Sequence, residues 1–308
     1  MTQTMNDIAA KSLGDSTSYA VYTDTFDSTL LNPMPRNIAR EGWGITGDEF
    51  VGADVWHCHE STFLLNNGLP VAGTLKFIYP ANSPFMVESK SAKLYLNSFD
   101  MCKMGETFFD AVSAYENQIK TDLEAILGCE IEVKFFGSAD YRPGPSYYAY
   151  DNVVNLLGPT VLETVEFTDY SGKENHIKFE LPRLSDYMTI RMYTNILRSR
   201  CRHTKQKDTG SAFIAVSSQT KKVSTLSVLK QVVSLREVNE FHEFCAEKLF
   251  VEIMKAAPSD VNVSVALLYS RRGSLDINPV RATDFETLNK ENTELLNINV
   301  LTIKTQGQ

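Results

Sequence analysis

One apolar stripe constrains the fold of this chain more than any other feature of its sequence. Phe241, Cys245, Leu249 and Ile253 recur at intervals of four residues. This spacing puts their side chains on one face of a helix and predicts a long amphipathic helix here. Pro258 ends the predicted helix, because proline has no amide hydrogen to donate within it.

Strand patterns flank this helix. From Val261 to Tyr269 valines alternate with polar residues before the run turns fully apolar, which is typical of a half-buried strand. Ser211 to Ser217 also reads as a strand, whereas Leu226 to Leu235 is mostly apolar and could form a strand or a helix. The second half is therefore predicted to run strand, long helix, strand.

The first half shows the same order of patterns. Lys93 to Phe99 is strand-like, Phe108 to Leu127 has helical spacing, and Glu130 to Phe136 alternates as a strand does. These strands lie too close together along the chain for regular parallel crossovers, so the sheet is expected to be mostly antiparallel.

A stretch rich in turn residues, Gly137 to Asn155, is the predicted linker between the halves. A chain of 308 residues suffices for about two units of roughly 150 residues, each with its own core. We therefore predict an α+β fold of two similar units, residues 1–150 and 151–308, with antiparallel sheets backed by helices.

The composition narrows the class of protein. The 38 acidic residues outnumber the 30 lysines and arginines, and a net charge of -8 disfavours nonspecific nucleic-acid binding by the whole surface. The apolar runs are strand-sized, so no membrane span is expected. The N-terminus is polar, without the apolar core of a signal peptide, and the five scattered cysteines form no CxxC pair. We expect a cytoplasmic protein with free thiols.

Two familiar cofactor motifs are missing. The sequence contains neither a GxGxxG stretch after a strand nor a GxxxxGK[ST] loop, so any nucleotide must bind in another way. His57 and His59 flank Cys58 and would share one face of a strand, where they could ligate a metal. No second pair of ligands is in view, and the sequence alone therefore does not predict a metal site.

Cys201 is the most reactive candidate among the thiols. Six cationic or ionisable residues surround it: Arg198, Arg200, Arg202, His203, Lys205 and Lys207. Positive charge stabilises the thiolate, which is the nucleophilic form, and Asp208 could exchange protons with whatever the sulfur attacks. Two alternatives remain: a buried thiol beside a solvated basic loop, or a basic run, Arg198 to Lys207, that binds the phosphates of a cofactor or polynucleotide.

Two other polar groups could take part in chemistry. His242 and Glu243 lie in the first turn of the predicted helix, where the helix dipole alone favours a carboxylate. Glu243 could instead accept hydrogen bonds from the amidine-like edge of a heterocycle, with His242 as a proton donor. The run ESKSAK, Glu88 to Lys93, reads either as a functional motif or as solvated residues before a strand.

ESKSAK belongs to a longer motif, Val87 to Phe99, that closely resembles the signature of the NADPH-dependent 7-cyano-7-deazaguanine reductases. These are the nitrile reductases of queuosine biosynthesis, and the resemblance is to their long, two-half form. Four other stretches agree with the family and occur in its order: Ser16 to Arg40, Gly52 to Pro70, Asn239 to Glu243, and Arg271 to Pro279.

The resemblance implies tandem tunnelling-fold halves, in which antiparallel sheets backed by helices form barrels with sites between units. It implies that Cys201 forms a covalent thioimide with the nitrile, that Asp208 protonates the nitrogen and that His242 assists proton transfer. It places the deazapurine against Glu88, Ser89, Phe241 and Glu243. The residues implied to bind NADPH are Lys90, Ser91, Lys93, Arg271, Arg272 and Gly273. A homodimer is also implied.

The loop after Cys201 departs from the family pattern, because Arg202, His203, Lys207 and Thr209 replace apolar and aromatic residues, and Ser274 replaces a glycine. Two alternative functions therefore stay open. One is an amidine-forming transferase that acts on deazaguanine within a nucleic acid, suggested by the basic run. The other is a non-catalytic protein that binds a deazapurine.

Overall fold

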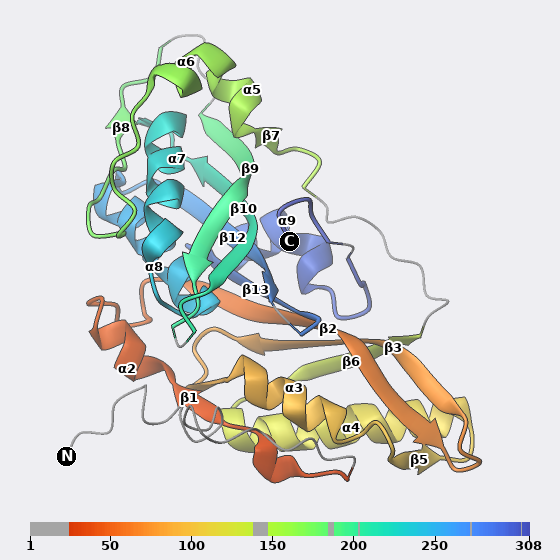
Figure 1. Ribbon diagram of the computed structural model, residues 1–308. Helices are drawn as coiled ribbons and strands as arrows, with labels where there is room; N and C mark the ends of the chain where they lie inside the picture. The colour runs from red at the N-terminus through yellow and green to blue at the C-terminus, as the bar shows by residue number, and fades with distance from the viewer. Residues whose placement is uncertain (1–24, 138–146, 184–187, 203, 272, 303) are drawn as a thin grey trace, which may run out of the picture.

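A computed structural model describes residues 25–137, 147–183, 188–202, 204–271, 273–302 and 304–308. Within these residues, nine strands form one continuous sheet with a single main path (Figure 1). Its strands in spatial order are β6 (Glu132–Gly137), β3 (Pro70–Pro80), β2 (Val51–Leu65), β13 (Leu275–Ala282), β12 (Asn262–Arg271), β10 (Lys207–Ser217), β9 (Thr189–Arg200) and β7 (Asp151–Asn152), with β5 (Lys103–Gly105) beside β2.

The long strands are all antiparallel to their neighbours, and only the short β5 and β7 pair in parallel. The pairing of β2 with β13 joins the first half of the chain to the second. Two smaller sheets lie outside the main one and pair β1 (Pro33–Pro35) with β4 (Phe85–Val87) and β8 (Phe179–Glu180) with β11 (Lys222–Val223).

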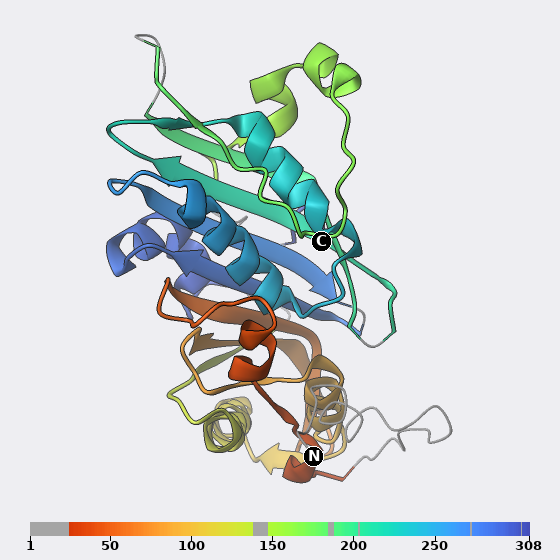
Figure 2. The ribbon, with the colours of Figure 1, turned by 90° about the vertical axis from the view of Figure 1, so that its left-hand side faces the viewer.

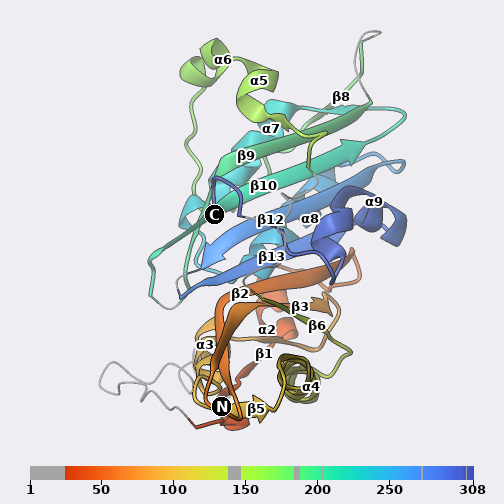
Figure 3. The same cartoon turned by 90° about the vertical axis from the view of Figure 1, so that its right-hand side faces the viewer.

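Helices cover both faces of the sheet. One face packs against α3 (Ser89–Asn97) and α4 (Phe108–Leu127) in the first half, and against α7 (Thr225–Ser234) and α8 (His242–Ala256) in the second (Figure 2). The other face packs against α9 (Phe285–Leu296) (Figure 3). The remaining helices are short: η1 (Ser28–Leu30), α2 (Arg36–Glu41), α5 (Val153–Leu157), α6 (Pro159–Thr164) and η2 (Leu235–Glu237).

The predicted fold class, antiparallel sheet backed by helices, is confirmed. Helix α4 has the predicted bounds, and α8, β10, β12 and β6 lie within a few residues of theirs. The ambiguous run Leu226 to Leu235 is the helix α7. In the described residues no helix combines the length and the apolar content that crossing a membrane requires.

The predicted strand Lys93 to Phe99 is wrong, because its first five residues belong to helix α3, which ends at Asn97, and the last two lie in the turn that follows. The Glu88 carboxylate accepts hydrogen bonds from the amides of Lys90 and Ser91, so it satisfies the free donors at the helix start. Tyr95 and Leu96 then bury one side of the helix against the core. The polar run ESKSAK therefore begins a helix rather than preceding a strand.

The order of elements repeats along the chain. Strands β2 and β3 precede α3, α4 and β6, and strands β9 and β10 precede α7, α8, β12 and β13. The division at residue 150 stays a prediction. Of the predicted linker, residues 138–146 lie outside the described part. Tyr147, which follows them, stacks on Phe213 of the second half with ring centroids 4.0 Å apart.

A buried ionic cluster joins the two halves at the β2–β13 seam. Asp54 of β2 accepts hydrogen bonds from Arg36 of α2 and from Arg281 of β13, the latter at 2.9 Å. Glu247 of α8 binds Arg281 at 2.9 Å and Arg40 of α2 at 2.7 Å. Burial alone would raise the pKa of Asp54, but Arg281 and Arg36 outweigh it and hold that pKa below its usual value.

Glu247→Gln should lower the free energy of unfolding by about 3–5 kcal/mol, because it leaves buried arginine charge uncompensated. Urea denaturation measures the loss. Glu237→Gln is the matched control, since Glu237 pairs with Arg200 at 2.6 Å with its side chain 51% exposed. An exposed pair contributes about 0–1 kcal/mol, so equal losses in the two variants would contradict the role given to the buried cluster.

Candidate functional site

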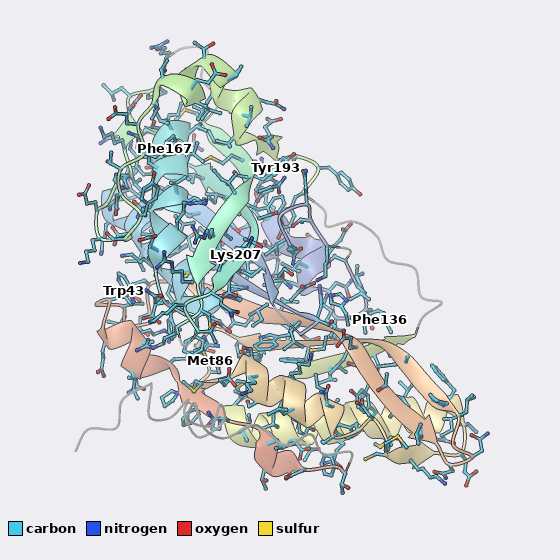
Figure 4. All side chains as sticks on the ribbon, viewed as in Figure 1. Trp43, Met86, Phe136, Phe167, Tyr193 and Lys207 are labelled. Carbon is cyan, nitrogen blue, oxygen red and sulfur yellow. The ribbon has the colours of Figure 1, made fainter. Side chains whose placement is uncertain are left out.

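A cleft of about 380 Å³ opens where α3, α8 and the turn between β9 and β10 meet. Strands β10 and β4 both contribute residues to this cleft. Figure 4 labels one residue on each of them, Lys207 of β10 and Met86 of β4. Both halves of the chain contribute to it. Its lining residues are Val87, Glu88, Ser89, Cys201, Arg202, Asp208, Glu240, Phe241, His242, Glu243 and Ile277.

Cys201 directly follows β9 and is held by a tight turn. Its amide donates to the carbonyl of Gln206 at 2.9 Å, and its carbonyl accepts from the amide of Lys205 at 3.0 Å. Lys205 has a φ of 56°, in the left-handed region that a reversal of this kind uses. The turn holds Cys201, which is 7% exposed, at the cleft wall.

Asp208 and His242 form a buried pair in the same cleft. Nε2 of His242 lies 3.3 Å from a carboxylate oxygen of Asp208, and both residues are less than 5% exposed. The imidazole stacks on the ring of Tyr269, with centroids 4.0 Å apart and planes 7° apart. A carboxyl and an imidazole in contact, with a thiol in the same cleft, can supply and remove protons around an attacked carbon.

Two glutamates from opposite halves line the cleft. Glu88 is the N-cap of α3, and its carboxylate oxygens accept the amides of Lys90 at 3.0 Å and Ser91 at 2.7 Å. Glu243 lies in the first turn of α8 and is 2% exposed. Together they give the cleft hydrogen-bond acceptors on both sides, which suits a planar ligand rich in N–H groups.

The pKa of Glu243 is raised to about 7. Burial is the main cause, and the negative charge of Asp54 adds to it. Arg36 and Arg281 of the ionic cluster act in the opposite direction and favour the carboxylate. Glu243 is therefore poised to change protonation near neutral pH.

The basic run around Cys201 is partly neutralised. Arg202 donates two hydrogen bonds to Glu240, at 2.9 and 2.8 Å, and Arg200 pairs with Glu237 at 2.6 Å. Burial raises the pKa of Glu240, and the positive charge of Arg202 reduces this shift. Two arginines of the run are thus paired with carboxylates, whereas Lys205 and Lys207 are exposed and His203 lies outside the described residues.

The predicted cofactor residues lie beside the cleft on and near α3. Lys93, Gly273 and Ser274 line a second pocket of about 210 Å³ with Glu60. The Lys93 side chain is 36% exposed and packs against Gly273, where an added Cβ would lie 2.7 Å from Lys93 Cδ. The Lys93 ammonium lies 3.8 Å from a carboxylate oxygen of the exposed Glu60, and a phosphate group bound in this pocket would replace that carboxylate as its partner.

The other predicted cofactor residues differ in their surroundings. Lys90 is partly exposed in the first turn of α3, whereas Ser91 is fully buried and donates to the Glu88 carbonyl at 2.7 Å. The Ser91 hydroxyl also accepts from the amide of Asn32 at 3.1 Å, and Ser91 lines neither the cleft nor the second pocket. Arg272 and the side chain of Arg271 lie outside the described part.

Ser274 replaces a glycine of the family pattern and adopts a left-handed backbone, with a φ of 61°. Such a conformation is costly for a residue with a Cβ. The Ser274 hydroxyl donates to the carboxylate of Glu60, a bond that offsets part of this cost and that glycine could not make.

Sequence reasoning missed three contributors to the site. Tyr269 supports His242, Ile277 lines the cleft from β13, and Arg36 opposes protonation of Glu243. Ile277 and Arg36 fall inside stretches that resemble the family, but no local pattern distinguishes them. Ile277 is placed by the pairing of β13 with β2, and Arg36 acts on Glu243 from a helix about 200 residues earlier in the chain.

Comparison with known families gives one match. Residues 22–135 match the family model described as nitrile reductase, 7-cyano-7-deazaguanine-reductase N-term. The matched segment includes β2, β3, α3 and α4, with Glu88 and Ser89 of the cleft. This segment of the chain is therefore similar to the N-terminal part of the 7-cyano-7-deazaguanine nitrile reductases, whereas Cys201, Asp208 and His242 lie outside the matched residues.

Proposed function

We propose that this chain reduces the nitrile of 7-cyano-7-deazaguanine to the amine of 7-aminomethyl-7-deazaguanine, with NADPH as reductant and Cys201 as covalent nucleophile. The observation that carries the proposal is the convergence of Cys201, Asp208 and His242 in one buried cleft. The reaction would take place in the cytoplasm, in a homodimer, on the free base.

The deazapurine would bind between the two halves. Glu243 in its carboxylate form can accept two N–H hydrogen bonds from the amidine-like edge of the base, while Glu88 and Ser89 approach from α3. Phe241, next to the start of α8, adds an aromatic wall. Binding between elements of both halves fixes the nitrile near Cys201.

Cys201 would then add to the nitrile. The sulfur–carbon bond forms, one carbon–nitrogen π bond breaks, and the nitrogen takes a proton from Asp208. The proton that the Cys201 thiol gives up returns to the Asp208–His242 pair. Two molecules of NADPH, bound in succession, would each supply one hydride, and the Asp208–His242 pair would supply the protons that the nitrogen takes up. The low exposure of Cys201 and Asp208 keeps water from the imine between these steps.

The cofactor phosphates would bind in the pocket at Lys93 and Gly273. Lys93 would act as a point charge on a phosphate, and the Gly273 backbone allows close approach. The basic run gives less support to a polynucleotide substrate, because Arg200 and Arg202 already pair with Glu237 and Glu240.

Mixing the protein with the free nitrile in the absence of NADPH should increase its intact mass by one nitrile molecule. Cys201→Ala should give no adduct and no turnover, because the thioimide needs this sulfur. Cys129→Ala is the matched control: that thiol is partly buried against the first-half core and should leave both adduct and turnover intact. Normal turnover by Cys201→Ala would disprove the covalent mechanism.

Binding of the nitrile should weaken as the pH falls through about 7, where Glu243 becomes protonated. Calorimetry with Cys201→Ala measures this affinity without turnover. Glu243→Gln should weaken binding roughly 10- to 100-fold at pH 8, since hydrogen bonds to a charged group contribute about 1.5–3 kcal/mol. It should also flatten the pH dependence. An affinity of Cys201→Ala that stays constant between pH 5.5 and 8 would contradict this role.

Protonation of Glu243 should also affect stability. Its folded pKa is raised, so its contribution to stability is complete below its unfolded pKa and is lost as the pH rises through about 7. Glu243→Gln should therefore be more stable than the parent at pH 8, with a smaller difference at pH 5. Urea denaturation at both values measures this, and an equal effect at both would contradict it.

Lys93→Ala should raise the KM for NADPH roughly tenfold or more while kcat changes little, because a charge-assisted contact to phosphate is lost. Steady-state kinetics at saturating nitrile measures the effect. Lys103→Ala, an exposed lysine of β5 at the far end of the first half, is the control and should change neither constant. Equal KM values in the two variants would remove Lys93 from the cofactor site.

A further inference from the structure

We propose that His57, His59 and Asp276 bind a divalent transition-metal ion of the Zn²⁺ class at the seam between the two halves. The sequence offered only the two histidines as ligands. The third ligand comes from a segment more than 200 residues away, which pairing of β2 with β13 places directly opposite His57. The ligand atoms of the three residues all lie within 4.8 Å of one another.

The donor set suits this class of metal. Two imidazole nitrogens and one carboxylate oxygen are a set that Zn²⁺ and Co²⁺ accept, with a fourth position left for water. Nε2 of His59 lies 2.6 Å from Oδ2 of Asp276. Metal–ligand bonds of about 2.0–2.2 Å need donor atoms somewhat further apart than that, so binding requires only a small rotation of His59.

Strand geometry fixes two of the three ligands. His57 is 3% exposed and Asp276 is 1% exposed, and both project from central strands of the sheet. His59 has a side chain that is 20% exposed, which gives an ion a route in from solvent. The site is therefore largely formed before binding, a condition that favours affinity.

The C-terminal tail already places a cation beside the carboxylate. Nζ of Lys304 lies 2.9 Å from Oδ1 of Asp276, and this side chain is 42% exposed, so it can move away. Lys76, on the strand next to His57, instead points its ammonium to the carbonyls of Asn297 and Val300, at 2.8 and 2.6 Å. Lys304 thus supplies positive charge to the buried Asp276 carboxylate, and a metal ion bound to this carboxylate would take the place of the ammonium.

The proposed metal site is separate from the cleft. Ile277 lines the cleft, and side chains alternate along a strand, so Asp276 next to it faces the opposite side of the sheet. The site thus lies on the other face of the sheet from the cleft, although His59 is the chain neighbour of Cys58 and Glu60, which line the proposed cofactor pocket. An ion there would tie β2 to β13 and stabilise the folded state in proportion to its concentration.

Titration of the metal-free protein with Co²⁺, followed by visible absorption, tests the proposal. One equivalent should give ligand-field bands without a thiolate charge-transfer band, and Zn²⁺ should displace the Co²⁺. His59→Gln and Asp276→Asn should each weaken binding at least tenfold. Lys304→Ala should strengthen binding severalfold, because it removes the competing ammonium; weaker binding in this variant would count against the site.

His176→Gln is the matched control. His176 also pairs with an aspartate, Asp169, at 3.1 Å, and its side chain is 18% exposed. This variant should bind Co²⁺ as the parent does. Melting temperatures and circular dichroism without metal identify any variant that fails to fold. No stoichiometric binding by the folded parent, or loss of binding in His176→Gln but not in His59→Gln, would overturn the proposal.

Discussion

The buried ionic cluster at the β2–β13 seam is the interaction on which the rest of the structure depends. Asp54 and Glu247 bind arginines from α2 and β13, so one set of contacts fixes the helix before the sheet, the strand seam and helix α8. Burying these charges is costly unless each is paired, and the pairing therefore specifies how the two halves meet. Since the cleft lies between elements of both halves, its geometry depends on the same contacts.

The cluster also acts on the chemistry of the cleft. Glu243 lies four residues, about one helical turn, before Glu247 in α8, and Arg36 and Arg281 favour its ionised form against burial and against Asp54. The balance places its pKa at about 7, where a carboxylate can hold N–H groups of a base. The ionic cluster that stabilises the fold thus also influences the charge of Glu243, which is predicted to bind the substrate.

The sequence predicted the parts that local patterns determine. The long apolar stripes predicted α4 and α8. The family motifs predicted four site residues, Cys201, Asp208, His242 and Glu243, and all four line one cleft. Helix α3 was missed because its start depends on capping by Glu88 rather than on apolar spacing. Neither the ionic cluster nor the approach of Asp276 to His59 has a local signal, since both arise from contacts between segments far apart in the sequence.

The central claim is that the cleft reduces a nitrile rather than only binding or derivatising it. The number of NADPH molecules oxidised per molecule of 7-cyano-7-deazaguanine, measured by absorbance together with the mass of the released base, tests this most directly. The account predicts two NADPH per nitrile and an aminomethyl product, because a nitrile needs two hydrides to become an amine. A covalent adduct on Cys201 that persists with NADPH present, with no NADPH consumed, would contradict it.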